Sequence, residues 1–261
     1  MYAIKNFFDN ENIQIKAKGG AFSVLEHIKD LSVMPHNAPS AYFNAQMGVR
    51  KRQVICDLSV SSVTTQAGAM QMMIGDVNAT TGLKGVGDLI TKALRSKVTN
   101  ETAIKPEYTG SGVLILEPTH KHIVLLDVGE WNGSVVLDDG LFLACESSLQ
   151  HKAVMRSNLS SAIAGGEGLF NLGLTGRGFV CLESPCPEEE LIEITLDNDC
   201  VKIDGSFAIA WSGSLNFTVE RSGKTLMGSA ASGEGLVNVY RGTGKLLVAP
   251  VSSSMPISVH A

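Results

Sequence analysis

Short runs of apolar or alternating residues recur along most of the chain, and glycine- or proline-containing turns separate them. Residues 192–196 (IEITL) alternate with period two, which is typical of a half-buried strand. Asp139-Gly140 and Asp204-Gly205 stand between such runs, and both positions of this dipeptide tolerate the positive φ of a hairpin turn. The pattern predicts an all-β fold of short strands joined by hairpins.

One block of sequence occurs three times. GGEGLFNLGLTGRGFVCLESP at residues 165–185 and SGEGLVNVYRGTGKLLVAP at residues 232–250 share Gly-Glu-Gly-Leu, a following Asn, a Gly-x-Gly turn and a closing Pro. A more divergent copy, NETAIKPEYTGSGVLILEP, occupies residues 100–118. A second block precedes each copy and carries the Asp-Gly turn, with Ala67-Gly68 in that place in the first unit. Such periodicity indicates an architecture of similar units that bury a shared core.

The repeat divides the chain into three tandem units, each expected to be a β-sandwich or a short double-stranded β-helix. A unit of this size exposes sheet edges, so we expect a pseudo-threefold arrangement of the units and further association into a closed homo-oligomer. The predicted segments are an N-terminal β segment at 1–53, β units at 54–118, 122–185 and 191–250, and a tail at 251–261.

One stretch of the first unit departs from the strand pattern. Between residues 84 and 97 apolar residues recur at helical spacing with lysine and arginine between them. We therefore expect a helix inserted near 84–97, either as a lid on the sheet or as a binding element.

The sequences GEGLFNLGLTGRG and IDGSFAIAWSGSL resemble bacterial members of the family named for altered inheritance of mitochondria protein twenty-four. The resemblance covers about residues 54–250. It implies a fold similar to that of the tryptophan RNA-binding attenuator protein. It also implies no enzymatic activity, no catalytic residues and at most a scaffold or assembly role.

Composition narrows the functional classes. The formal net charge of -5 provides no general electrostatic attraction for nucleic acid, and the short basic cluster Arg50-Lys51-Arg52 is expected on a solvated loop. The acidic run 188–190 is also expected at the surface. Without a signal peptide or an apolar run of membrane-spanning length, the chain is expected in the cytoplasm, with its five cysteines reduced.

Three glutamates recur with the repeat: Glu101, Glu167 and Glu234. They could converge to bind a cation, or each could accept hydrogen bonds from backbone N–H groups in its own glycine-rich turn. The structural role is favoured, because each opens a strand and three converging carboxylates would repel one another. An RNA-binding ring would instead carry lysine, arginine and aromatic residues at matched positions.

His120 and His122, followed by Asp127, imitate part of the metal motif of cupins. A site of that kind needs a further histidine, and the downstream candidates His151 and His260 lack suitable neighbours. No cofactor is expected.

The favoured function is therefore a non-enzymatic oligomeric β scaffold or interaction protein. The alternatives are a cupin-like metal-dependent enzyme or small-ligand binder using His120 and His122, and RNA binding by analogy of fold. Trp131 and Trp211 are expected to lie in the core or at an interface.

Overall fold

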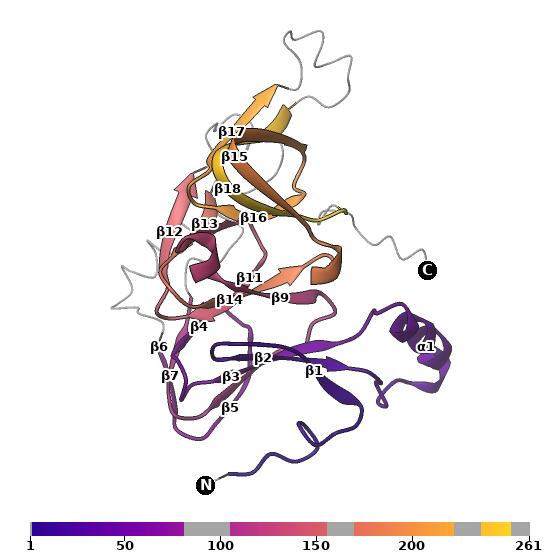
Figure 1. The fold of residues 1–261 in the computed structure, drawn as a ribbon. Helices are drawn as coiled ribbons and strands as arrows, with labels where there is room; N and C mark the ends of the chain where they lie inside the picture. Colours follow the sequence, from indigo (N-terminus) through magenta and orange to yellow (C-terminus); the bar gives the residue numbers. More distant parts are fainter. Residues whose placement is uncertain (1, 81–104, 156–169, 222–235, 252–261) are drawn as a thin grey trace, which may run out of the picture.

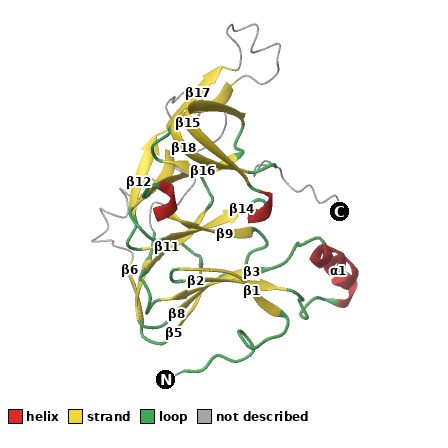
Figure 2. Cartoon of the chain, viewed as in Figure 1, coloured by secondary structure: helices red, strands yellow, loops and turns green. Residues whose placement is uncertain are grey.

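The computed structural model describes residues 2–80, 105–155, 170–221 and 236–251, and within them it is nearly all β. Its strands form three sheets, and every pair of neighbouring strands is antiparallel (Figure 2). The sheets follow one another along the long dimension of the molecule (Figure 1). The all-β prediction is confirmed. The helix expected near 84–97 lies outside the described residues.

The first sheet has five strands and contains most of the N-terminal part of the chain. In spatial order these are β1 (Ile13–Gly19), β2 (Phe22–His27), β3 (Arg52–Asp57), β8 (Val113–Leu116) and β5 (Met70–Ile74).

The second sheet has six strands, and its β4–β11 pair joins the N-terminal part of the chain to the middle part. Its order is β6 (Val77–Thr80), β7 (Glu107–Gly110), β4 (Val63–Thr65), β11 (Phe142–Glu146), β14 (Phe179–Ser184) and β9 (His122–Asp127). The 3-10 helix η2 (Val128–Trp131) follows β9.

The third sheet has seven strands. Its order is β12 (Gln150–Met155), β13 (Phe170–Thr175), β10 (Ser134–Leu137), β16 (Ala208–Ser212), β18 (Leu236–Val248) and β15 (Ile192–Asp204), with β17 (Asn216–Arg221) also pairing with β18. The acidic run forms the exposed 3-10 helix η3 (Glu188–Glu190), as expected.

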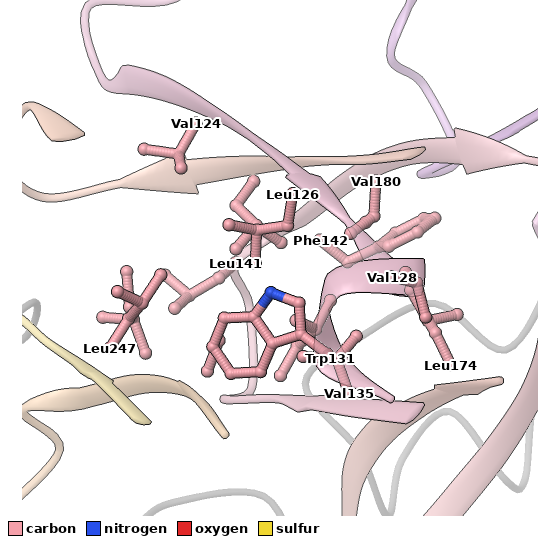
Figure 3. Packing of buried hydrophobic residues seen from close by; sticks show 14 of the residues in the cluster. Val124, Leu126, Val128, Trp131, Val135, Leu141, Phe142, Leu174, Val180 and Leu247 are labelled. Carbon is pink, nitrogen blue, oxygen red and sulfur yellow. The ribbon is translucent and has the colours of Figure 1, made fainter. Parts of the chain in front are cut away.

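Apolar cores hold the sheets together. One cluster joins the first and second sheets and includes Phe22, Leu114 and Tyr108. The largest joins the second and third sheets, where Trp131 packs among valine and leucine side chains (Figure 3). Trp211 is also buried and packs on Phe217 and Tyr240 with ring centroids 5.5 and 5.2 Å away. The expectation that both tryptophans are core residues is confirmed.

The Asp-Gly turns form, but they do not make hairpins. Gly68, Gly140 and Gly205 all have positive φ, as the repeat predicts. However, the strands on either side of Gly140, β10 and β11, belong to different sheets. The hairpin prediction is wrong there because the turn sets only the local backbone direction, whereas each strand pairs where its apolar face is buried.

The N-terminal segment adds strands β1 and β2 as predicted, but it also contains helices that the sequence analysis missed. The 3-10 helix η1 (Pro35–Asn37) leads directly into α1 (Ala38–Gln46). No residue of α1 is buried. Its sequence therefore carries no apolar stripe facing a core, which is the signal by which a helix is normally recognised.

Candidate interaction surface

The three repeat glutamates Glu101, Glu167 and Glu234 lie outside the described residues. The histidine pair is described. His120 is exposed before β9, whereas His122 is the half-buried first residue of that strand and pairs with Ser184. Burial, and then the nearby guanidinium of Arg52, lower the pKa of His122. His122 therefore favours its neutral form.

Among the described residues, no group of three or more His, Cys, Asp and Glu side chains could hold a metal ion. His120 and His122 thus have no third ligand from this part of the chain. His151 lies elsewhere, on β12, where its Nε2 is 3.2 Å from the Sγ atom of Cys145. Four of the five cysteines are buried, and all five are free thiols. Burial raises the pKa of Cys145 to about 12, so this thiol is not a nucleophile at neutral pH.

The basic cluster occupies a different environment from the one the sequence suggested. Arg52 is only 4% exposed, and its Nη2 lies 2.8 Å from Oε2 of the buried Glu26. Arg50 is half-buried and donates from Nη1 to Oε1 of Glu26 over 2.9 Å. The expectation of a solvated basic loop is therefore wrong. A carboxylate distant in sequence draws the two arginines inward, because a buried charge requires a partner.

Burial by itself would raise the pKa of Glu26, but the hydrogen bonds and charges of Arg50 and Arg52 outweigh it and lower this pKa. The carboxylate therefore stays ionised. This ion-pair cluster leaves little positive charge free for a phosphate backbone.

The same arginines hold the chain segment between β2 and β3, residues 28–51, which we call the β2–β3 excursion. Arg50 Nε donates to the carbonyl oxygen of Ala45 in the last turn of α1 over 3.1 Å, and Arg52 Nη2 donates to that of Gly48 over 2.8 Å. Cationic donors at a helix C-terminus satisfy carbonyl groups that have no partner within the helix. Lys51 pairs with Asp30 at the opposite end of the excursion. The base of the excursion is therefore fixed by charged groups.

The outer part of the excursion is apolar and exposed. Met47 is 81% exposed and Leu31 is 80% exposed. Figure 1 shows α1 standing to the side of the sheets. The exposed large apolar side chains of the excursion are Leu31, Met34, Tyr42, Phe43, Met47 and Val49. Large exposed apolar patches are typical of surfaces that bind other molecules, whereas single exposed apolar residues are ordinary.

No aspartate, glutamate, lysine or arginine lies in α1, so the helix exposes Tyr42 and Phe43 without any charged side chain of its own. The sequence does not reveal this surface, because its apolar residues fit a strand of the N-terminal β segment equally well. One local signal was present: Pro39 lies at the start of the helix, where a missing N–H group costs nothing. None of the described helices is long and apolar enough to cross a membrane.

Comparison with known proteins supports the resemblance drawn from the repeat. An uncharacterised protein of Streptococcus pyogenes serotype M6 is 33% identical over 195 residues, which cover 72% of this chain and 76% of that protein. A crystal structure of a Streptococcus pyogenes protein superposes with a TM-score of 0.58 at 29% identity, covering 78% of this chain and 89% of the other. The family model described as "Mitochondrial biogenesis AIM24" matches residues 45–251, and the chain belongs to that family.

Proposed function

We propose that this protein is a non-enzymatic β scaffold that acts by binding other proteins, and that the β2–β3 excursion is its partner-binding surface. The observation that carries the proposal is a set of exposed apolar side chains on a segment whose base is fixed by ion pairs to the buried Glu26. Because the base is fixed, the backbone of the excursion has less conformational entropy to lose when a partner covers the outer part.

The chemistry of the surface favours a protein partner with an apolar groove. Helices that lie on membrane surfaces carry lysine and arginine on their polar face, whereas α1 carries none. Helix-in-groove recognition relies on apolar and aromatic side chains such as Tyr42, Phe43 and Met47. The family match begins at residue 45, so most of the excursion precedes it. A partner bound there would be a feature of this chain more than of the shared fold.

The proposal also assigns the protein to the cytoplasm. Its support is chemical: the free cysteines include four buried thiols, which fit a reducing compartment.

The test compares the wild-type protein with the triple variant Y42S/F43S/M47S. All three residues are exposed, so the free energy of unfolding should change by less than about 1.5 kcal/mol in total. Immobilised protein of each type is exposed to native-cell extract, and captured proteins are identified and compared by quantitative mass spectrometry. The purified partner is then titrated calorimetrically. The wild type should bind one protein saturably, and the triple variant should bind it at least tenfold more weakly.

F8S is the matched control, because Phe8 is 54% exposed outside the excursion. Equal capture by the wild type and the triple variant would overturn the proposal. So would saturable binding to anionic lipid vesicles that requires Tyr42 and Phe43 in the absence of any protein partner.

A further inference from the structure

Three strands, β5, β11 and β16, have the same pairing pattern. Each pairs with a later strand, respectively β8, β14 and β18. In each of these three pairings the register shifts at the beginning of the earlier strand. The shift falls between Met70 and Met72 in β5, between Phe142 and Ala144 in β11, and between Ala208 and Ala210 in β16.

The second edge of β11 and of β16 is also paired with a strand, and the two pairings have the same register. β4 pairs with β11, placing Val63 opposite Glu146, and β10 pairs with β16, placing Val135 opposite Ser212. Among the described residues, β5 has no such neighbour and ends the first sheet.

Burial follows this difference in pairing. Every residue of β11 (FLACE) and of β16 (AIAWS) is buried. β5 (MQMMI) has no buried residue, and Met70, Met72 and Met73 are 36%, 42% and 43% exposed. An apolar, uncharged edge strand is a site where another strand adds, because its unpaired N–H and C=O groups form a template.

The matching donor strand lies at the other end of the molecule. Val63 of β4 pairs with Tyr108, and Val135 of β10 pairs with Leu174. In β15, Val201 pairs with Tyr240 in the corresponding place. β15 therefore corresponds to β4 and β10, yet it ends the third sheet among the described residues. Figure 1 shows β5 and β15 at opposite ends of the molecule.

We propose that β15 of one copy of this chain pairs antiparallel with β5 of a second copy, repeating the β4–β11 and β10–β16 pairings between molecules. Transferring the register of those pairings places Val201 opposite Ile74, Lys202 opposite Met73 and Ile203 opposite Met72. This deepens the proposed scaffold function by specifying one interface and its partner.

The association is heterologous, because two different surfaces meet. It therefore produces a closed ring if successive rotations close and a filament if they do not. Each internal pairing of this type joins only three residue pairs, so a single interface is expected to be weak, with dissociation constants in the micromolar range. Assembly should accordingly depend strongly on protein concentration.

Cysteine cross-linking tests the register. In a C200S background, which removes the one exposed native thiol, M73C and K202C are made as separate proteins. Antiparallel neighbours have Cα atoms about 4.5–5.5 Å apart, which is within disulfide reach. Oxidation should cross-link the mixture of the two proteins but neither protein alone. Efficient cross-linking of M73C to itself would show twofold pairing of β5 with β5, and this would overturn the proposal.

Charge reversal tests the same contact in solution without cross-linking. M73K places two lysines opposite each other and should raise the dissociation constant in sedimentation about tenfold. The double variant M73K/K202E should restore association, whereas V60K, at a residue 60% exposed outside β5, should leave it unchanged.

Two results would overturn the β15–β5 pairing. One is a wild-type protein that stays monomeric in sedimentation at 100 µM, roughly 100-fold above a micromolar dissociation constant. The other is an oligomer whose dissociation constant M73K leaves unchanged. Neither result would alter partner capture through Tyr42, Phe43 and Met47, so failure of this inference is distinguishable from failure of the proposed function.

Discussion

Glu146 provides the sharpest test of how the first and second sheets are joined. Its side chain is buried at the end of β11, and its two carboxylate oxygens accept from different parts of the chain. Oε1 accepts from the backbone N–H of Ala21 over 2.9 Å, and Oε2 accepts from that of Phe179 over 3.0 Å. Ala21 lies in the turn between β1 and β2, whereas Phe179 begins β14. The carboxylate therefore links two sheets.

The loss of unfolding free energy expected for Glu146→Ala follows from these two hydrogen bonds. A buried N–H group that loses its partner costs about 1–3 kcal/mol, so two such groups cost about 2–6 kcal/mol. Removing the carboxylate also removes the cost of burying its charge, which lowers the net destabilisation to about 1–4 kcal/mol. Ser212 occupies the equivalent place in β16, where its Oγ accepts one bond, from the N–H of Lys245 over 3.0 Å. Ser212→Ala should therefore cost only about 1 kcal/mol.

Urea denaturation followed by the fluorescence of the buried tryptophans measures both free energies of unfolding. Glu146→Gln, which retains one carbonyl acceptor, should fall between the wild type and Glu146→Ala. Amide hydrogen exchange should accelerate at Ala21 and Phe179 in Glu146→Ala. A loss below about 0.5 kcal/mol for Glu146→Ala, within the range of ordinary surface substitutions, would refute the reasoning. A larger loss for Ser212→Ala than for Glu146→Ala would refute it equally.

Further predictions concern the ion-pair cluster and two turns. Glu26→Gln leaves Arg52 buried without its counter-charge and should cost about 3 kcal/mol in urea unfolding, whereas Glu189→Gln, at an exposed pair, should cost less than about 1 kcal/mol. Because the folded-state pKa of Glu26 is lowered, its contribution is present above the unfolded pKa of about 4.3 and is lost as pH falls through the folded value. Acid titration of stability below about pH 5 should therefore be shallower in Glu26→Gln, and an identical titration would contradict the ion pair. Gly110→Ala should lower the thermal midpoint far more than Gly48→Ala: both glycines have positive φ, but only at Gly110 would a Cβ collide with a backbone carbonyl. Equal midpoints for the two alanine variants would contradict the steric argument.

Local signals in the sequence predicted local structure well. Period-two apolar runs became strands, and Gly-x-Gly turns placed Gly110, Gly176 and Gly242 at strongly positive φ in all three copies. These properties depend on a few neighbouring residues. Strand partners do not, and β10 and β11 joined different sheets although the turn between them formed as expected.

Long-range contacts account for the principal errors at the candidate surface. Arg50 and Arg52 were expected in solvent, because nothing near them in sequence shows that Glu26 lies across the β2–β3 pair. The apolar residues of α1, among them Tyr42 and Phe43, fit a core by composition alone. Hydropathy measures the tendency of a side chain to leave water, but it does not specify whether the same chain or a partner covers it.

The sheet edges show how selectively this chain resists association. β1, β12 and β15 each carry lysine, namely Lys16, Lys152 and Lys202, and a charged edge opposes indiscriminate strand addition. β5 carries no charge and exposes methionine, although its counterparts β11 and β16 are wholly buried. Methionine is flexible and can pack along the methylene stem of Lys202, so the uncharged β5 edge can accept a charged strand that the lysine-carrying edges would reject. The contrast between β5 and the protected edges is therefore expected of a chain that selects one partner strand.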